Sequence, residues 1–182
     1  NLNKHCRAGT CYLKLYRITG EKIYKDRAEK IFSHYKGIMR YHQKENRYIW
    51  NFWEPFIPID IGSKPKGWVE VHPERPGYQA AETEMMAESY HTGIVFSEDD
   101  MKKIVNTNLW MWNKSVSKPE FKSADGSTKA GTLWAGLADF DPTIRQIYAV
   151  MVKDNNSEVD EEYFSKVIMK EPPSFKRKYV TG

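Results

Sequence analysis

Residues 12–35 place the strongest constraint on how this chain folds. They read YLKLYRITGEKIYKDRAEKIFSHY, and apolar or aromatic residues recur every three or four positions on both sides of Thr19-Gly20. This spacing gives each of two short helices one buried face. Gly20 stands where a left-handed residue ends a helix at least cost. We therefore predict a helical hairpin that turns at Thr19-Gly20 and exposes the mixed charges of residues 21–30 to solvent.

The remainder of the chain predicts two further hairpins. Gly93 is placed to stop a helix, Ser97 and Asp100 have capping-box spacing, and Asp141-Pro142 has the form of a helix start. The helices expected along the chain cover residues 4–18, 21–41, 78–91, 98–112, 129–138 and a segment that begins at Asp141-Pro142. The expected fold class is all-α, with one domain over 1–152 and a polar C-terminal tail over 153–182.

A long irregular segment separates the first two hairpins. Residues 47–77 contain five prolines and three glycines, which exclude a long helix. The alternating aromatic residues Tyr48, Trp50 and Phe52 indicate a short extended stretch. Loops of this length inside a domain often carry function, so we expect the site here.

Composition argues against two classes of partner. The formal net charge is +4, but the basic residues are scattered, and the only basic cluster is Lys176-Arg177-Lys178. This pattern does not predict a nucleic-acid interface. No apolar run approaches the roughly 18 to 20 residues of a membrane span, so no membrane partner is expected. The sequence has no HExxH, paired CxxC, GxSxG or phosphate-binding glycine loop, and we expect neither a metal nor another cofactor.

Three segments together resemble a known architecture. LKLYRITGEKIYKDRAEKI resembles the helix, turn and helix of six-hairpin glycosidase-like proteins and toroidal polysaccharide lyases, YIWNFWEP resembles the aromatic loop that follows it, and AAETEMMAESYHTGIVFSEDDMKKIVNT resembles the next hairpin. The resemblance covers residues 3–150. It implies part of an (α/α) toroid, because three hairpins make half of a six-hairpin ring. It also implies a periplasmic or secreted protein that acts on polysaccharides, whose ring is completed by further hairpins of a longer chain or by another subunit.

The richest candidate for chemistry precedes the third helix. His72, Glu74, Arg75 and Tyr78 combine an imidazole, a carboxylate, a guanidinium and a phenol within seven residues. In β-elimination on a uronic acid, His72 would be the base, Tyr78 the acid and Arg75 the clamp for the sugar carboxylate. The alternative is a proline-stiffened loop whose polar residues cap a helix and whose tyrosine packs in the core.

A second candidate has the composition of a sugar subsite. Trp50, Asn51, Trp53 and Glu54 combine two indole faces with hydrogen-bonding groups, which suits the C–H faces and hydroxyls of a saccharide. The alternative is that these rings plug the end of the helical scaffold. His5 and Glu82 are additional candidates for contact with the substrate. Glu82 and Glu84 project about 200° apart on a helix and are not expected to work as a pair.

Two other features are better explained by structure. Trp110, Trp112 and Trp134 fall on helical patterns and are expected in the core. His91 has the spacing for a contact with Glu88, but a histidine near a helix end more often has a structural role. The sequence thus predicts a saccharide-binding protein, a lyase or glycoside hydrolase for an acidic polysaccharide. The alternative is a non-catalytic helical-hairpin module, or the structural half of a larger toroidal enzyme.

Overall fold

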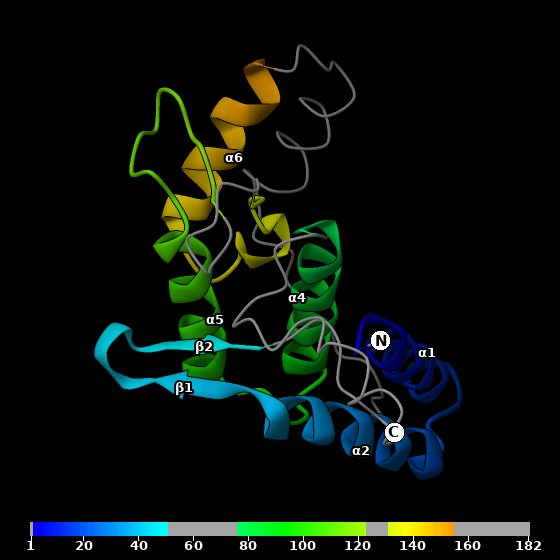
Figure 1. Ribbon diagram of the computed structural model, residues 1–182. Helices are drawn as coiled ribbons and strands as arrows, with labels where there is room; N and C mark the ends of the chain where they lie inside the picture. Colours follow the sequence, from blue (N-terminus) through cyan, green and yellow to red (C-terminus); the bar gives the residue numbers. More distant parts are fainter. Residues whose placement is uncertain (1, 51–75, 123–130, 155–182) are drawn as a thin grey trace, which may run out of the picture.

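The structure is a computed structural model that describes residues 2–50, 76–122 and 131–154. Its described part is mainly helical, as the sequence predicted, and includes one small antiparallel sheet (Figure 1). The helices are α1 (Leu2–Thr19), α2 (Lys22–Ile38), α4 (Pro76–His91), α5 (Glu98–Trp110) and α6 (Pro142–Asp154). The last of these extends into the segment that was expected to be a polar tail.

The first hairpin forms as predicted. Helices α1 and α2 pack along each other, and Gly20 between them has a φ of 72°. The Thr19 hydroxyl donates to the Leu15 carbonyl and accepts from the Glu21 amide, which closes the turn. The two helices approach closely at Gly9, where an added Cβ would lie 2.8 Å from Cε2 of Phe32. The residues from Lys25 to Lys30 lie mostly at the surface, as expected.

The second helix was predicted to continue to residue 41, and this is wrong. It ends at Ile38, and the chain then forms strand β1 (Arg40–His42), a 3-10 turn (Gln43–Glu45) and strand β2 (Arg47–Ile49). Asn46 adopts the left-handed conformation that lets the hairpin turn. The Asn106 side chain donates to the Asn46 carbonyl, so α5 fixes the hairpin. Pairing with a later strand and contact with α5 override the local helical pattern.

The second helical hairpin agrees with the sequence more closely. Gly93, with a φ of 77°, follows α4, and a capping box at Ser97 begins α5. The Ser97 hydroxyl accepts from the Asp100 amide, while the Asp100 carboxylate accepts from the Ser97 amide. Figure 1 shows α4 and α5 standing beside each other above α2 and the β-hairpin.

The helix expected over 129–138 is wrong where the chain is described. Only Ala135–Leu137 is helical, as a single 3-10 turn. The buried side chain of Asn108 explains the difference, because it donates to the Thr132 carbonyl and accepts from the Trp134 amide. Those backbone groups are therefore bonded to α5 and not to a helix of their own. No two-helix third hairpin forms within residues 131–154.

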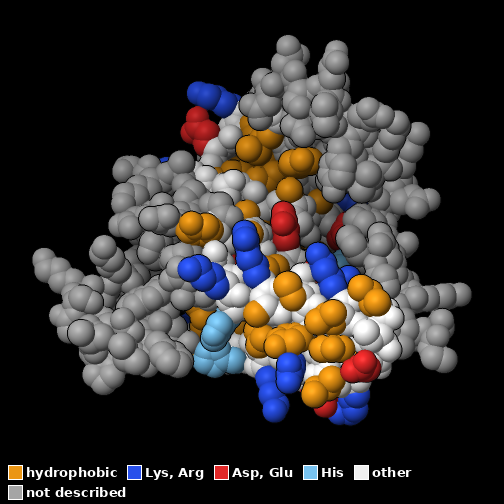
Figure 2. Space-filling model, turned by 90° about the vertical axis from the view of Figure 1, so that its right-hand side faces the viewer, with side chains coloured by type: hydrophobic (Ala, Val, Ile, Leu, Met, Phe, Trp, Pro, Cys, Tyr) orange, Lys and Arg blue, Asp and Glu red, His pale blue; other side chains and the backbone are white. Residues whose placement is uncertain are grey.

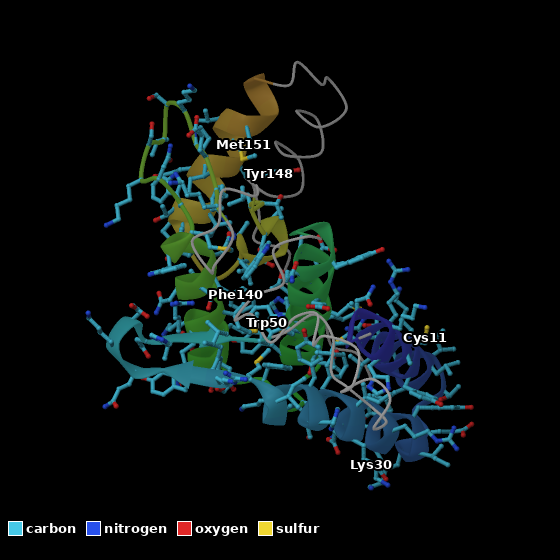
Figure 3. All side chains as sticks on the ribbon, viewed as in Figure 1. Cys11, Lys30, Trp50, Phe140, Tyr148 and Met151 are labelled. Atoms are coloured by element: carbon cyan, nitrogen blue, oxygen red, sulfur yellow. The ribbon has the colours of Figure 1, made fainter. Side chains whose placement is uncertain are left out.

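Helix α6 begins where the sequence placed its start. Asp141 Oδ1 accepts from the Thr143 amide, which is an N-terminal cap, and Pro142 is the first helical residue. The Arg145 side chain donates to the Ala138 carbonyl and so connects α6 to the preceding turn. Figure 3 labels Tyr148 and Met151 on α6 and Phe140 just before it, and all three pack against the core.

The tryptophans divide between core and surface. Trp134 is buried as expected and Trp112 is partly buried, but Trp110 is 42% exposed, so its assignment to the core is wrong. Its ring instead packs against the Arg47 guanidinium, whose carbon lies 4.0 Å from the ring centre. Among the described helices, none combines the length and the apolar character needed to cross a membrane.

Candidate functional site

The predicted site residues are only partly within the described chain. His72, Glu74, Arg75, Asn51, Trp53 and Glu54 all lie outside the described residues. The four that the structure places are His5 on α1, Trp50 after β2, and Tyr78 and Glu82 on α4. Two of these four, Trp50 and Glu82, are brought into direct contact.

Glu82 is the centre of a buried polar cluster. Its Oε2 accepts two hydrogen bonds, from the Trp50 indole at 2.9 Å and from the Tyr35 hydroxyl at 2.7 Å. The carboxyl group is therefore shared by α4, α2 and the end of β2. Trp50 is 2% exposed and Glu82 is fully buried, and the Trp50 ring also packs against Trp134 with ring centres 5.4 Å apart. Figure 3 shows Trp50 in the interior, near α4.

The environment of Glu82 favours its protonated form. Burial raises the pKa of its carboxyl to about 7, although the hydrogen bonds from Trp50 and Tyr35 act in the opposite direction. The same burial, with the charge of Glu82, raises the pKa of the Tyr35 hydroxyl and of the Cys6 thiol. A carboxyl group that titrates near neutral pH is typical of an acid or base in a functional site.

No described residue donates a hydrogen bond to Glu82 Oε1, although that atom is buried. Asn3 Oδ1, on the same side of α1 as Cys6 and one turn before it, is also buried without a donor from the described residues. Buried acceptors normally have a donor, so an unsatisfied carboxyl oxygen calls for an explanation.

Tyr78 and His5 occupy different surroundings. Tyr78 is partly buried and lies four residues before Glu82, so both project from one face of α4 near its N-terminal end. His5 is exposed, and its ring meets His34 edge to face with centres 6.1 Å apart. The structure thus associates Tyr78 with the Glu82 side of α4 and places the His5 ring against α2.

Sequence reasoning missed Tyr35. It was counted only among the apolar residues of the second helix, and its hydroxyl is the donor that connects α2 to Glu82. A tyrosine on a buried stripe was the available signal, because a buried phenol usually finds a polar partner. Which partner it finds depends on how α2 and α4 pack.

Glu88 and His91, near the C-terminal end of α4, each contact a residue of another segment. Glu88 pairs with Arg17 at 2.6 Å, which connects α4 to α1. His91 Nε2 lies 3.6 Å from Asp139 Oδ2, and its ring stacks on Phe140. These contacts give both residues a structural role, as the alternative interpretation of His91 expected.

Residues 2–50, 76–122 and 131–154 contain no group of three metal-ligating side chains in a suitable arrangement. Comparison with known proteins adds no family to this description. No protein-family model, no curated protein and no solved structure matches the chain. The arrangement around Glu82 therefore has to be interpreted from its own chemistry.

The pKa of Glu82 predicts a pH dependence of stability. The carboxyl titrates near 4.5 when unfolded and near 7 when folded, so the unfolded chain releases the proton first as pH rises. The free energy of unfolding therefore decreases as the pH rises from about 4.5 to about 7. Relative to wild type, Glu82→Gln should become more stable by up to about 3 kcal/mol between pH ~4.5 and pH ~8. Thermal unfolding of both proteins across this range measures the difference, and a difference that stays constant with pH contradicts the assignment.

Proposed function

We propose that the chain binds an acidic saccharide at the N-terminal end of α4 and belongs to a carbohydrate-active protein of the (α/α) toroid type. The observation that carries the proposal is the Glu82 carboxyl, whose pKa is about 7. One of its oxygens accepts from Trp50 and Tyr35, and the other has no donor among the described residues. A neutral carboxyl can donate a hydrogen bond to a sugar hydroxyl or oxyanion, and an ionised one can accept.

The start of α4 supports an anionic ligand. A helix of 16 residues has a partial positive charge at its N-terminal end, and the first turn of α4 contains no acidic residue to neutralise it. A uronic-acid carboxylate would be favoured there over a neutral sugar. Tyr78 lies in this part of the helix with its side chain partly exposed, whereas Glu82 lies one turn further in.

These positions suggest separate roles. Tyr78 would meet the ligand and supply the phenol of an elimination, the role that the sequence predicted for it. Glu82 would hold the Trp50 indole and the Tyr35 hydroxyl through Oε2 and would hydrogen-bond the ligand through Oε1. Hydrolysis stays open as the alternative reaction, since a carboxyl with a pKa near 7 also suits a general acid for glycosidic bonds.

Binding and turnover of uronic-acid oligosaccharides test the proposal, with neutral glucan oligosaccharides as the comparison. Calorimetry should detect binding of the uronates only. Glu82→Gln and Tyr78→Phe should each weaken binding about 10- to 100-fold, which corresponds to the free energy contributed by one hydrogen bond to a charged group. If elimination occurs, ultraviolet absorbance of the conjugated product should rise for wild type, and the rate should fall by about two to four orders of magnitude for Tyr78→Phe.

Two matched substitutions serve as controls. Glu84→Gln makes the same change on the other side of α4 at an exposed residue, and Tyr41→Phe removes an exposed phenol on the β-hairpin. Both should bind like wild type. Equal binding of neutral and acidic sugars, or full affinity in both Glu82→Gln and Tyr78→Phe, would contradict the proposed site.

The second candidate is a non-catalytic helical-hairpin module. It is favoured by the burial of Trp50 and Glu82, which would then serve only to hold α2, α4 and β2 together. In that case Glu82→Gln would change the melting temperature and no saccharide would bind. The calorimetry therefore separates the two functions.

A further inference from the structure

Helix α1 has two apolar stripes, and only one of them faces the core. The buried stripe comprises Leu2, Cys6, Gly9 and Leu13. The second stripe comprises Ala8, Cys11, Leu15 and Ile18, all exposed. Their spacing of three, four and three residues is the seam along which one helix packs on another. We call these four residues the outer seam.

The outer seam is the side of α1 that the described fold leaves open. Helix α2 covers the side of Gly9, where Phe32 packs, and α4 covers the side of Arg17 through the pair with Glu88. Ile18 is 81% exposed and Ile23, at the start of α2, is 51% exposed. Figure 2 shows hydrophobic side chains gathered on this face over α1 and α2, with Lys and Arg side chains and a few Asp and Glu side chains at their margins. Figure 3 shows Cys11 on the outer side of α1.

The charges that α1 itself places beside the outer seam have one sign. Helix α1 contains no aspartate or glutamate, and its exposed Lys4, Arg7 and Lys14 have no ionic partner among the described residues. Arg7 and Lys14 lie seven residues apart, so they form a row along one edge of the seam. A partner for this face would therefore combine an apolar stripe with carboxylates at its edge.

We infer that the outer seam of α1 binds an acidic amphipathic helix of another protein. Two copies of α1 would bring their own basic rows together, so charge disfavours self-association through this face. Ala8 and Cys11 are small and allow a helix backbone to approach, and the seam lacks the Trp and Phe side chains typical of helices that lie on lipid. The seam is separate from Glu82, so this inference does not depend on the proposed function.

Two synthetic helical peptides test it with the full chain. Both carry leucine at the a and d positions of a heptad repeat, one with glutamate and the other with lysine at the flanking e and g positions. Fluorescence anisotropy should show binding of the glutamate peptide and at least about tenfold weaker binding of the lysine peptide. Cys11 is exposed and Cys6 is buried, so maleimide should label Cys11 first. The glutamate peptide should slow that labelling at least about fivefold if it covers the seam.

Substitutions test whether the glutamate peptide binds at the outer seam. Ile18→Glu and Lys14→Glu should each weaken binding about tenfold or more. The controls Val116→Glu and Lys44→Glu likewise replace an apolar and a basic residue by glutamate at exposed positions outside α1, and should bind like wild type. Absence of binding, equal binding of both peptides, or unchanged labelling of Cys11 would overturn the inference. Two further results would overturn it. In one, the chain sediments as a dimer that Ile18→Glu abolishes. In the other, the chain binds phosphatidylserine vesicles, the glutamate peptide does not block that binding, and Ile18→Glu abolishes it.

Discussion

Trp50→Ala is expected to lower the free energy of unfolding by about 3–5 kcal/mol, the range for a large aromatic side chain lost from a core. Trp50 is almost fully buried, and its ring packs against Trp134. Truncation would leave a cavity beside Trp134 and would remove one of the two donors that Glu82 Oε2 accepts from. Both effects act in the folded state, so chemical denaturation should report the full loss.

Trp110→Ala is the matched control, because it removes the same side chain from a partly exposed position. Its only described aromatic contact is with the Arg47 guanidinium, and we expect a loss of about 1 kcal/mol. Trp50→Phe retains a ring but lacks the indole donor, and it separates packing from the hydrogen bond. If Trp50→Ala kept the wild-type stability and lost only saccharide affinity, Trp50 would be the stacking platform that its sequence context suggests.

Asp100→Ala is expected to cost about 2–4 kcal/mol. The Asp100 carboxylate accepts from the Lys36 ammonium at 2.6 Å, from the Tyr48 hydroxyl at 2.9 Å and from the Ser97 amide at 2.7 Å. It thus connects α2, β2 and the start of α5. Its removal would break the capping box and leave the partly buried Lys36 without its carboxylate. Asp99→Ala, at the neighbouring but exposed residue that pairs with Lys103 along α5, should cost no more than about 1 kcal/mol.

The same carboxylate predicts loss of stability in acid. Burial alone would raise the pKa of Asp100, but the hydrogen bonds from Lys36, Ser97 and Tyr48 outweigh it and lower the pKa to about 2. A lowered pKa stabilises the folded state at pH values above the unfolded value of 3.8. This contribution, on the order of 2 kcal/mol, should disappear as pH falls from about 4 to about 2. Acid titration of the wild type and Asp100→Asn should show a dependence in the wild type that the variant lacks.

The sequence by itself determined the features that depend on a few neighbouring residues. The turn at Thr19-Gly20, the stop at Gly93, the capping box at Ser97 and the start of α6 at Asp141-Pro142 all lie where the residue types placed them. In each, the deciding interaction is a backbone conformation or a hydrogen bond that spans no more than four residues. The mainly helical class follows from the same local periodicity.

Only the tertiary structure decided the rest, because the deciding partners are distant in sequence. The end of α2 depends on strand pairing and on Asn106, and the segment before Ala135 is held by Asn108. Trp110 has the helical spacing of a core residue, yet the fold leaves it at the surface beside Arg47. The sequence marked Glu82 and Trp50 as separate candidates. Their hydrogen bond, the addition of Tyr35 and the raised pKa exist only because α2, α4 and β2 meet around one carboxyl group.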